Sequence, residues 1–253
     1  MKLGSQFYSI RTECETPEAL RNSFKVTKEQ GYDIVQISAV CPIEAERLKS
    51  FIDEFSLPVP LTHQNLEAIT TRTDELIAYH KVIGAETIGL GAMPKAYRAS
   101  LEAFREAKRI LAEPIKKITD AGLRFAYHNH AFDFVAADGV KFYDFLFDEI
   151  PDADFIPDVY WMKYADEDAL AWLEKLFRAN RVKNVHFKDM KTEPQGEICA
   201  CGDGITDFVP MAKLCKKYGV ENIYVEQDNA PETGSPFAEM KRSYDFLDKI
   251  VHI

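Results

Sequence analysis

Short apolar runs alternate with longer amphipathic segments along the whole chain. The first apolar run covers residues 2–10, and Thr16-Pro17 then supplies an N-cap and a proline at the first helical position. This helix ends at Gly31, because glycine is favoured just after the last helical turn. The same pattern recurs seven more times. The eight predicted strands are residues 2–10, 33–38, 58–63, 87–90, 123–128, 155–160, 182–187 and 222–226.

A helical pattern follows each predicted strand, which indicates parallel strands joined by crossover helices. An open doubly wound sheet would normally carry a glycine-rich phosphate loop after its first strand. The chain instead continues as Ser9-Ile10-Arg11-Thr12-Glu13, and no GxGxxG motif occurs in it. We therefore predict an α/β fold, a TIM (β/α)8 barrel in a single domain covering residues 1–253. After the first helix, the predicted helices are residues 43–55, 66–83, 96–121, 140–149, 166–178, 207–217 and 237–250.

Composition narrows the class of protein and its partners. The 253 residues include 31 basic and 41 acidic residues, a net charge of −10, which argues against nucleic acid and anionic membranes as partners. No apolar stretch approaches the roughly 20 residues of a membrane span. The five cysteines show no disulfide or zinc-ribbon spacing, as expected of free thiols in a reducing compartment. We expect a soluble cytoplasmic protein, either a monomer or a homo-oligomer.

Polar residues gather where the last four predicted strands end. In a parallel barrel these carboxyl ends meet on one face, where catalytic groups lie. Histidine, aspartate and glutamate supply the nitrogen and oxygen ligands of divalent cations. These strand ends therefore predict a cation site. Their segments are His128-Asn129-His130 with Asp133, Asp158-Val159-Tyr160-Trp161, His186-Phe187-Lys188-Asp189 and Glu226-Gln227-Asp228.

The two-residue period of a strand selects among these side chains. His186 shares a face with Lys188, and Glu226 shares a face with Asp228. A carboxylate inside a barrel needs a counter-ion or a metal, since an unpaired buried charge is costly. Asp158, His186 and Glu226 lie at successive strand ends, which favours one shared site over three unrelated polar residues.

Other residues near the predicted mouth are weaker candidates. Lys188 could neutralise an enolate or contact a hydroxyl, with a surface ion pair as the alternative. His63 is the last residue of the third strand and could line the pocket, while Tyr8 and Trp161 could stack on a sugar ring, as could Phe132. Two further histidines, His80 and His252, are interpreted as structural or solvated.

Taken together, these segments resemble the sugar phosphate isomerase/epimerase family of the xylose isomerase-like TIM barrel superfamily. The resemblance spans essentially the whole chain and specifies the superfamily, but not one substrate. It implies one divalent cation, often Mn²⁺ (with Mg²⁺, Co²⁺ or Zn²⁺ as alternatives), and a small sugar as substrate. The segments that carry it are Tyr127-His128-Asn129-His130, Phe132-Asp133-Phe134, Asp158-Val159-Tyr160-Trp161, His186-Phe187-Lys188-Asp189-Met190 and Val225-Glu226-Gln227-Asp228-Asn229.

The resemblance also assigns roles to individual residues. It implies Asp158, His186 and Glu226 as metal ligands. The fourth ligand follows the fifth strand, where Asp133 is favoured over His128 and His130. The implied catalytic residues are Glu226, Lys188 and His128, and the implied substrate-binding residues are Tyr8, His63, His130, Trp161 and Asp228.

The expected activity is isomerisation or epimerisation of a sugar or keto-polyol, through proton abstraction next to a carbonyl and a metal-stabilised enediolate. Family members often use two glutamates, on the fifth and eighth strands, and only Glu226 matches that pair here. Lyase or dehydratase chemistry of the inosose dehydratase kind is therefore an alternative, and a metal-free sugar-binding barrel is another. A related endonuclease would need a basic groove, which the net charge of −10 disfavours.

Overall fold

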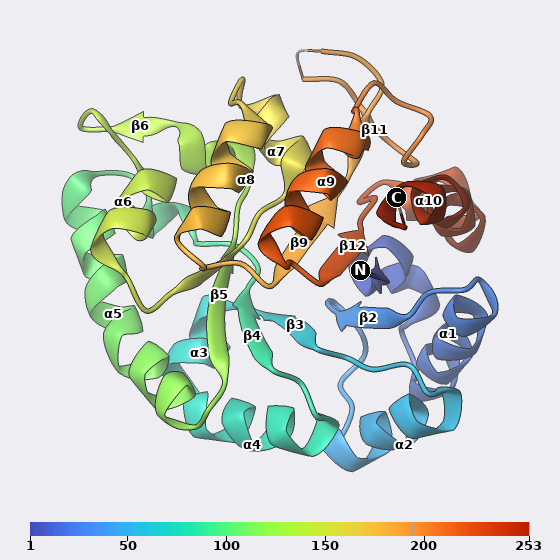
Figure 1. Ribbon diagram of the computed structural model, residues 1–253. Coiled ribbons are helices and arrows are strands. Elements are labelled where there is room, and N and C mark those ends of the chain that lie inside the picture. Colours follow the sequence, from blue (N-terminus) through green and yellow to red (C-terminus); the bar gives the residue numbers. More distant parts are fainter. Residues whose placement is uncertain (194, 253) are drawn as a thin grey trace.

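The computed structural model is an α/β barrel in which parallel strands are enclosed by helices (Figure 1). The structure describes residues 1–193 and 195–252. Neighbouring strands pair in parallel in the order β8-β5-β4-β3-β2-β1-β12-β9, and parallel bridges between Phe155 and Val182 and between Asp158 and His186 close the ring. The predicted TIM barrel is confirmed. The barrel strands are β1 (Lys2–Gln6), β2 (Ile34–Ile37), β3 (Leu61–Gln64), β4 (Thr87–Leu90), β5 (Arg124–His128), β8 (Asp154–Ile156), β9 (Asn184–Phe187) and β12 (Asn222–Val225).

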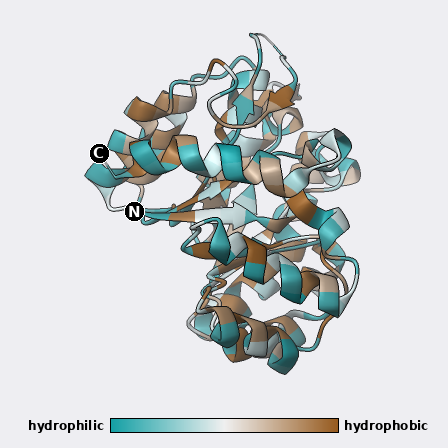
Figure 2. Cartoon of the chain, turned by 90° about the vertical axis from the view of Figure 1, so that its right-hand side faces the viewer, coloured by the Kyte–Doolittle hydropathy of each residue, from teal (hydrophilic) through white to brown (hydrophobic). Residues whose placement is uncertain are grey.

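Helices cover the outside of this ring, and each carries both hydrophobic and hydrophilic residues (Figure 2). The last helix lies beside the first strand, so the two ends of the barrel sequence meet (Figure 1). None of the described helices has the length and apolar character needed to cross a membrane. The helices are α1 (Pro17–Glu29), α2 (Ala45–Phe55), α3 (Leu66–Thr71), α4 (Thr73–Ile83), α5 (Leu101–Asp120), α6 (Phe142–Glu149), α7 (Val159–Tyr164), α8 (Ala169–Arg178), α9 (Phe208–Tyr218) and α10 (Pro236–Val251).

Short strands and 3₁₀ turns lie in the loops at the carboxyl ends of the barrel strands. Two small antiparallel hairpins project there, β6 (Ala136–Ala137) with β7 (Val140–Lys141) and β10 (Asp189–Met190) with β11 (Ile198–Cys199). The 3₁₀ turns are η1 (Phe7–Glu13), η2 (Lys95–Tyr97), η3 (Ala131–Phe134) and η4 (Ala230–Thr233).

The first and sixth strands are shorter than predicted. The first strand ends at Gln6, whose side chain accepts a hydrogen bond from the Tyr8 backbone N–H and starts η1. The sixth ends at Ile156, and Asp158 is already the N-cap of α7. Both predictions failed for the same reason: buried apolar residues continue past the strand end into a helical turn that packs at the mouth of the barrel.

Two predicted helices also differ in their bounds. The helix predicted for residues 66–83 is interrupted at Arg72, whose backbone φ of −131° is not helical. The helix predicted for residues 96–121 begins only at Leu101, where the Ser100 hydroxyl accepts from the Ala103 N–H. The break at Arg72 and the cap at Ser100 are local features of the backbone, which an amphipathic pattern alone does not show.

An apolar plug fills the barrel beneath its mouth. Its five buried residues come from five strands, and the Tyr224 ring lies 6.1 Å from the His186 ring at the strand ends. Gly4 makes this packing feasible, because a Cβ there would lie 2.5 Å from the Tyr224 ring. The plug therefore excludes water below the polar residues at the mouth. Its members are Ile34, Leu61, Ala126, Ile156 and Tyr224.

His80 couples the packing of α4 against β3 to pH. Its ring is fully buried, with Nδ1 2.6 Å from the Leu76 carbonyl oxygen and Nε2 2.7 Å from the Thr62 hydroxyl. Burial lowers the pKa of His80 from 6.5 to about 4. The folded protein therefore holds a neutral ring that the unfolded chain would protonate below pH 6.5.

We predict that His80 makes the protein lose stability in acid. Its contribution is complete above pH 6.5 and falls by about 3 kcal/mol as the pH drops to 4, because only the unfolded chain binds the proton there. Urea unfolding of wild type and His80→Gln at several pH values between 4 and 7 measures this. The pH slope should be shallower in the variant, whereas His252→Gln, at an exposed histidine, should keep the wild-type slope. Parallel curves for wild type and His80→Gln would contradict the assignment.

Candidate functional site

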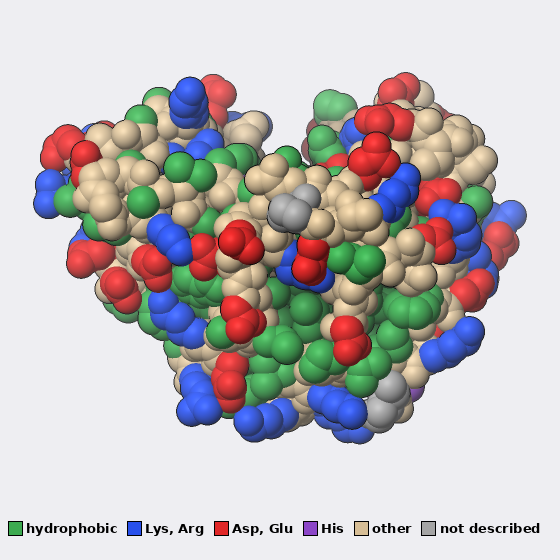
Figure 3. All heavy atoms as spheres, turned by 90° about the horizontal axis from the view of Figure 1, so that it is seen from above, with side chains coloured by type: hydrophobic (Ala, Val, Ile, Leu, Met, Phe, Trp, Pro, Cys, Tyr) green, Lys and Arg blue, Asp and Glu red, His purple; other side chains and the backbone are tan. Residues whose placement is uncertain are grey.

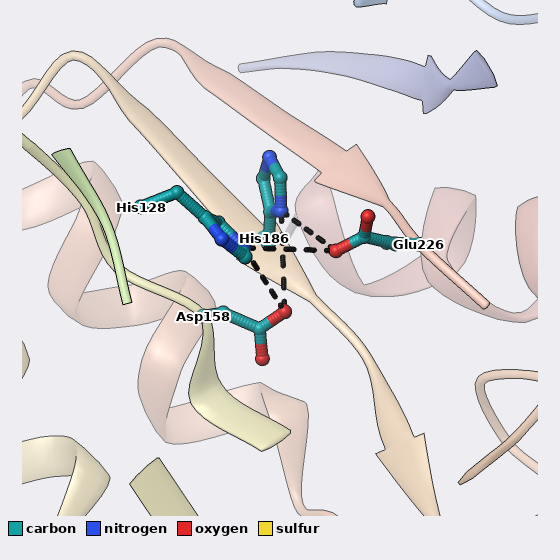
Figure 4. A group of neighbouring side chains, drawn as sticks. All are labelled: His128, Asp158, His186 and Glu226. Atoms are coloured by element: carbon teal, nitrogen blue, oxygen red, sulfur yellow. Dashed lines mark hydrogen bonds and ion pairs between the residues drawn. The ribbon is translucent and has the colours of Figure 1, made fainter. Parts of the chain in front are cut away.

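Four buried side chains meet at the carboxyl ends of adjacent barrel strands (Figure 4). His128 ends β5, Asp158 follows β8, His186 lies on β9 and Glu226 follows β12. One ligand atom from each lies within 4.8 Å of the others, so the group could hold a metal ion. His128 Nε2 is 3.5 Å from Asp158 Oδ2 and 3.7 Å from Glu226 Oε2. His186 Nδ1 is 3.0 Å from Glu226 Oε2 and 3.9 Å from Asp158 Oδ2.

Each histidine uses its other nitrogen on an oxygen outside this group. His186 Nε2 lies 2.7 Å from the Gln36 side-chain oxygen, and His128 Nδ1 lies 3.2 Å from the Gly91 carbonyl oxygen. An oxygen of either kind only accepts hydrogen bonds, so these nitrogens carry the ring protons. The nitrogens that face Asp158 and Glu226 are therefore lone-pair acceptors when the rings are neutral.

When both rings are neutral, this arrangement sets acceptors against acceptors. Burial lowers the pKa of His186 despite the nearby Glu226 carboxylate, so its Nδ1 lone pair faces a carboxylate oxygen. For His128, burial acts to lower the pKa, but Asp158 and Glu226 outweigh it and raise the pKa. His128 Nε2 and Asp158 Oδ2 are both buried and have no hydrogen-bond partner among the described residues. A positive centre between these atoms would satisfy all four.

The donor set fits a divalent cation. Two nitrogens and two carboxylate oxygens are ligands that Zn²⁺ and similar ions accept, with bonds of about 2.0–2.2 Å. Ligand atoms bound at such lengths lie about 3–4 Å from one another. The four separations given above, 3.0 to 3.9 Å, fall in that range. These separations are compatible with one cation held by all four residues.

Asp158 is held in place by its backbone and by one carboxylate oxygen. The Asn129 side chain accepts from the Asp158 N–H at 2.8 Å and donates to the Asp158 carbonyl at 3.2 Å. Asp158 Oδ1 accepts from the Trp161 N–H at 3.0 Å and caps α7. Oδ2 is thereby left to face the two histidines. Asn129 was missed as a functional residue, although its place between His128 and His130 was a signal.

Lys188 is a fully buried cation beside the same carboxylates. Its Nζ lies 2.7 Å from Asp228, 3.5 Å from Glu226 and 3.7 Å from Asp158. Burial acts to lower the pKa of Lys188, but these carboxylates outweigh it and raise the pKa, so the ammonium stays charged. Burial similarly acts to raise the pKa of Glu226, and Lys188 and His186 reverse it, so that the pKa lies well below its usual value. The alternative given for Lys188, an ion pair on the surface, does not apply, because its ion pairs are buried.

Asp133 lies apart from the four-residue group, although the sequence favoured it as the fourth ligand. Its carboxylate accepts from the Tyr127 hydroxyl at 2.9 Å and the His130 N–H at 2.8 Å, and Arg98 lies 3.9 Å away. Burial raises the pKa of Asp133 to about 7. Asp133 therefore anchors the turn after β5. The structure corrects the choice at this strand end and brings His128 to the group.

A cavity of about 360 Å³ opens above the group. All five predicted substrate-binding residues line it, together with Lys188 and Glu226. Burial lowers the pKa of His63 and of His130, so both rings are neutral in the folded protein. The predicted substrate residues along its wall are Tyr8, His63, His130, Trp161 and Asp228.

Asp189 organises the long loop that follows Lys188, a role that sequence reasoning missed. Its buried carboxylate accepts four backbone N–H groups, at 2.9 to 3.1 Å. Gly204 permits this approach, since a Cβ there would lie 2.5 Å from an Asp189 oxygen. The signal in the sequence was the acidic residue directly after Lys188. The donors belong to Met190, Gly202, Gly204 and Thr206.

Comparison with known proteins identifies the family of the chain and agrees with its fold. The profile of the family described as xylose isomerase-like TIM barrel matches residues 24–250. The chain belongs to this family. An inosose dehydratase of Clostridium beijerinckii is 27% identical over 168 residues, 56% of this chain and 54% of that protein, so the chain spans about half the length of the curated relatives it matches.

Solved structures of the family share the fold over nearly the whole chain. A sugar phosphate isomerase/epimerase from Parabacteroides distasonis superposes with a TM-score of 0.80 at 21% identity, covering 97% of this chain and 93% of that one. The IolI protein, solved with a bound zinc atom, superposes with a TM-score of 0.77 at 13% identity, covering 99% of this chain and 98% of that one.

We predict that His128→Gln and Asp133→Asn have different effects, because His128 belongs to the metal group whereas Asp133 stabilises the turn after β5. His128→Gln should weaken binding of Mn²⁺ or Zn²⁺ at least tenfold, because it removes a ligand nitrogen. Asp133→Asn should retain the metal but lower the free energy of unfolding by about 1–3 kcal/mol, because the amide offers one acceptor oxygen to the Tyr127 hydroxyl and the His130 N–H where the carboxylate offers two. Metal content after dialysis, chelator competition and urea unfolding measure the two effects. Loss of metal from Asp133→Asn with retention in His128→Gln would restore the original choice.

Proposed function

We propose that this protein is a metal-dependent enzyme that removes the proton next to the carbonyl of a keto-sugar or keto-polyol. The observation that carries the proposal is the set of four inward-facing acceptor atoms on His128, Asp158, His186 and Glu226, below a cavity with an ionised carboxylate and a buried lysine. Such a set is costly in a metal-free sugar-binding barrel, because each unpaired buried acceptor costs about 1–3 kcal/mol.

The residues of the site have different roles in the proposed reaction. A divalent cation held by the four ligands would supply Lewis acidity to the substrate carbonyl and a neighbouring hydroxyl. Glu226 is ionised and buried at the cavity, so it is the proposed proton acceptor as well as a ligand. Lys188 keeps its proton and would stabilise negative charge that develops on the substrate oxygen. His128, predicted as a catalytic residue, acts in this proposal as a ligand.

The placement of the carboxylates bears on the reaction type. Glu226 and Asp228 come from one strand end, and both lie beside Lys188, so they approach the cavity from one side. Epimerisation at a single carbon needs proton transfer on two faces, whereas dehydration can use one carboxylate that takes the α-proton and returns it to the leaving hydroxyl. Together with the inosose dehydratase relatives, this favours dehydration of a keto-polyol.

Aldose–ketose isomerisation is the second candidate. It also needs proton transfer on one face only, and the Parabacteroides distasonis isomerase/epimerase shares the fold. Incubation of the Mn²⁺-supplied protein with inosose and with neutral ketoses in D₂O distinguishes the two. Dehydration gives a product that has lost one water, and isomerisation gives an isomer in which deuterium has replaced hydrogen at the exchanged carbon.

We predict that Glu226→Gln lowers the rate of α-proton exchange by about 10²–10⁴-fold, because the amide cannot accept the proton. Exchange is measured by NMR in D₂O, and circular dichroism checks that the fold is intact. Glu113→Gln, at an exposed glutamate of α5, makes the same chemical change away from the cavity and should retain wild-type exchange. Near-wild-type exchange in Glu226→Gln would remove Glu226 from the proposed mechanism.

A further inference from the structure

The positive charge of Lys188 is balanced by carboxylates of the site. An ammonium has three N–H donors, and three carboxylates, those of Asp158, Glu226 and Asp228, lie within 3.7 Å of its Nζ. The Trp161 and Tyr160 rings lie 4.7 and 5.4 Å from the same atom. Lys188 therefore donates one hydrogen bond, to Asp228, and its positive charge is balanced by carboxylates before an anionic ligand arrives.

The other cations near the mouth are also engaged. One terminal nitrogen of Arg11 donates to the carbonyl oxygens of Tyr8 and Asp228, each at 2.9 Å, and its guanidinium packs on the Tyr8 ring. Arg98 donates to the Met93 carbonyl and packs on the Phe132 ring. Among the described residues that line the cavity, Lys188 is the one with a fixed positive charge.

Asp228 is the carboxylate of this set that reaches the opening. Its side chain is 27% exposed, whereas those of Asp158 and Glu226 are at most 5% exposed. A ligand entering the cavity thus meets the Asp228 carboxylate before it reaches Lys188. A phosphate group would face this negative charge, while a hydroxyl can donate a hydrogen bond to it.

We infer that Asp228 makes this site select uncharged polyols over their phosphate esters. It does so by neutralising Lys188 and by presenting an acceptor to substrate hydroxyls at the opening. The inference rests on the proposed function for its substrate, and it goes beyond it by excluding sugar phosphates. Asp228 is thereby a specificity-determining residue, and its removal should free Lys188 for an anion.

Two binding measurements test this inference. In the first, calorimetry compares D-fructose with fructose 6-phosphate on Mn²⁺-supplied protein. Wild type should bind the phosphate ester at least tenfold more weakly than the ketose, and Asp228→Asn should reduce this ratio below threefold. A phosphate ester that binds wild type as tightly as the ketose would overturn the inference.

The second measurement needs no sugar recognition. Low-millimolar sulfate, a tetrahedral dianion, is titrated while the melting temperature is followed. Asp228→Asn should show a saturable rise, which the double variant Asp228→Asn/Lys188→Met should lose. Wild type should show none. Asp53→Asn is the matched control, because it also frees a lysine, Lys49, but on the surface of α2, and it should behave as wild type.

The two measurements separate the inference from the proposed function. Saturable sulfate binding to wild type, or its absence in folded Asp228→Asn, would overturn the role of Asp228. If neither fructose nor inosose binds any variant while sulfate behaves as expected, the substrate proposed above is wrong and the charge selection stands.

Discussion

The structure of the site depends on one constraint: hydrogen-bond acceptors on buried side chains face one another at the floor of the cavity. The oxygens of Gln36 and Gly91 accept hydrogen bonds from the ring N–H groups of His186 and His128, so the lone pairs of the neutral rings face the carboxylates of Asp158 and Glu226. Such an arrangement is unfavourable without a positive centre, because buried acceptors need donors or cations. The surrounding fold holds it in place nonetheless.

The barrel supplies that rigidity through its register. Tyr224 pairs with His186 across β12 and β9, and the bridge between Asp158 and His186 closes the ring at the same level. Ligands at the ends of adjacent, hydrogen-bonded strands cannot move apart without breaking the sheet. The buried Lys188 also balances the negative charge of the Glu226 carboxylate within the site. On the outer face shown in Figure 3, acidic and basic side chains are intermixed, and the described part of this face has no continuous basic surface.

Much of this could be predicted from the sequence, because strand ends in a parallel barrel share one face. The eight-fold alternation and the polar residues after the last four strands suffice for the fold, and they place Asp158, His186 and Glu226 near one another. The choice between Asp133 and His128 could not be made in this way. It depends on whether the chain turns just after β5, and that turn is set by hydrogen bonds from Tyr127 and His130 to Asp133. The hydrogen bonds between the Asn129 side chain and the Asp158 backbone likewise depend on β5 lying next to β8.

The most direct test of the account is a crystal structure of the protein grown with Mn²⁺, with anomalous diffraction used to locate the metal. The account predicts one peak about 2.0–2.3 Å from each of four atoms, His128 Nε2, Asp158 Oδ2, His186 Nδ1 and Glu226 Oε2. A peak bound to Asp133, or no peak between these four atoms at saturating Mn²⁺, would contradict it.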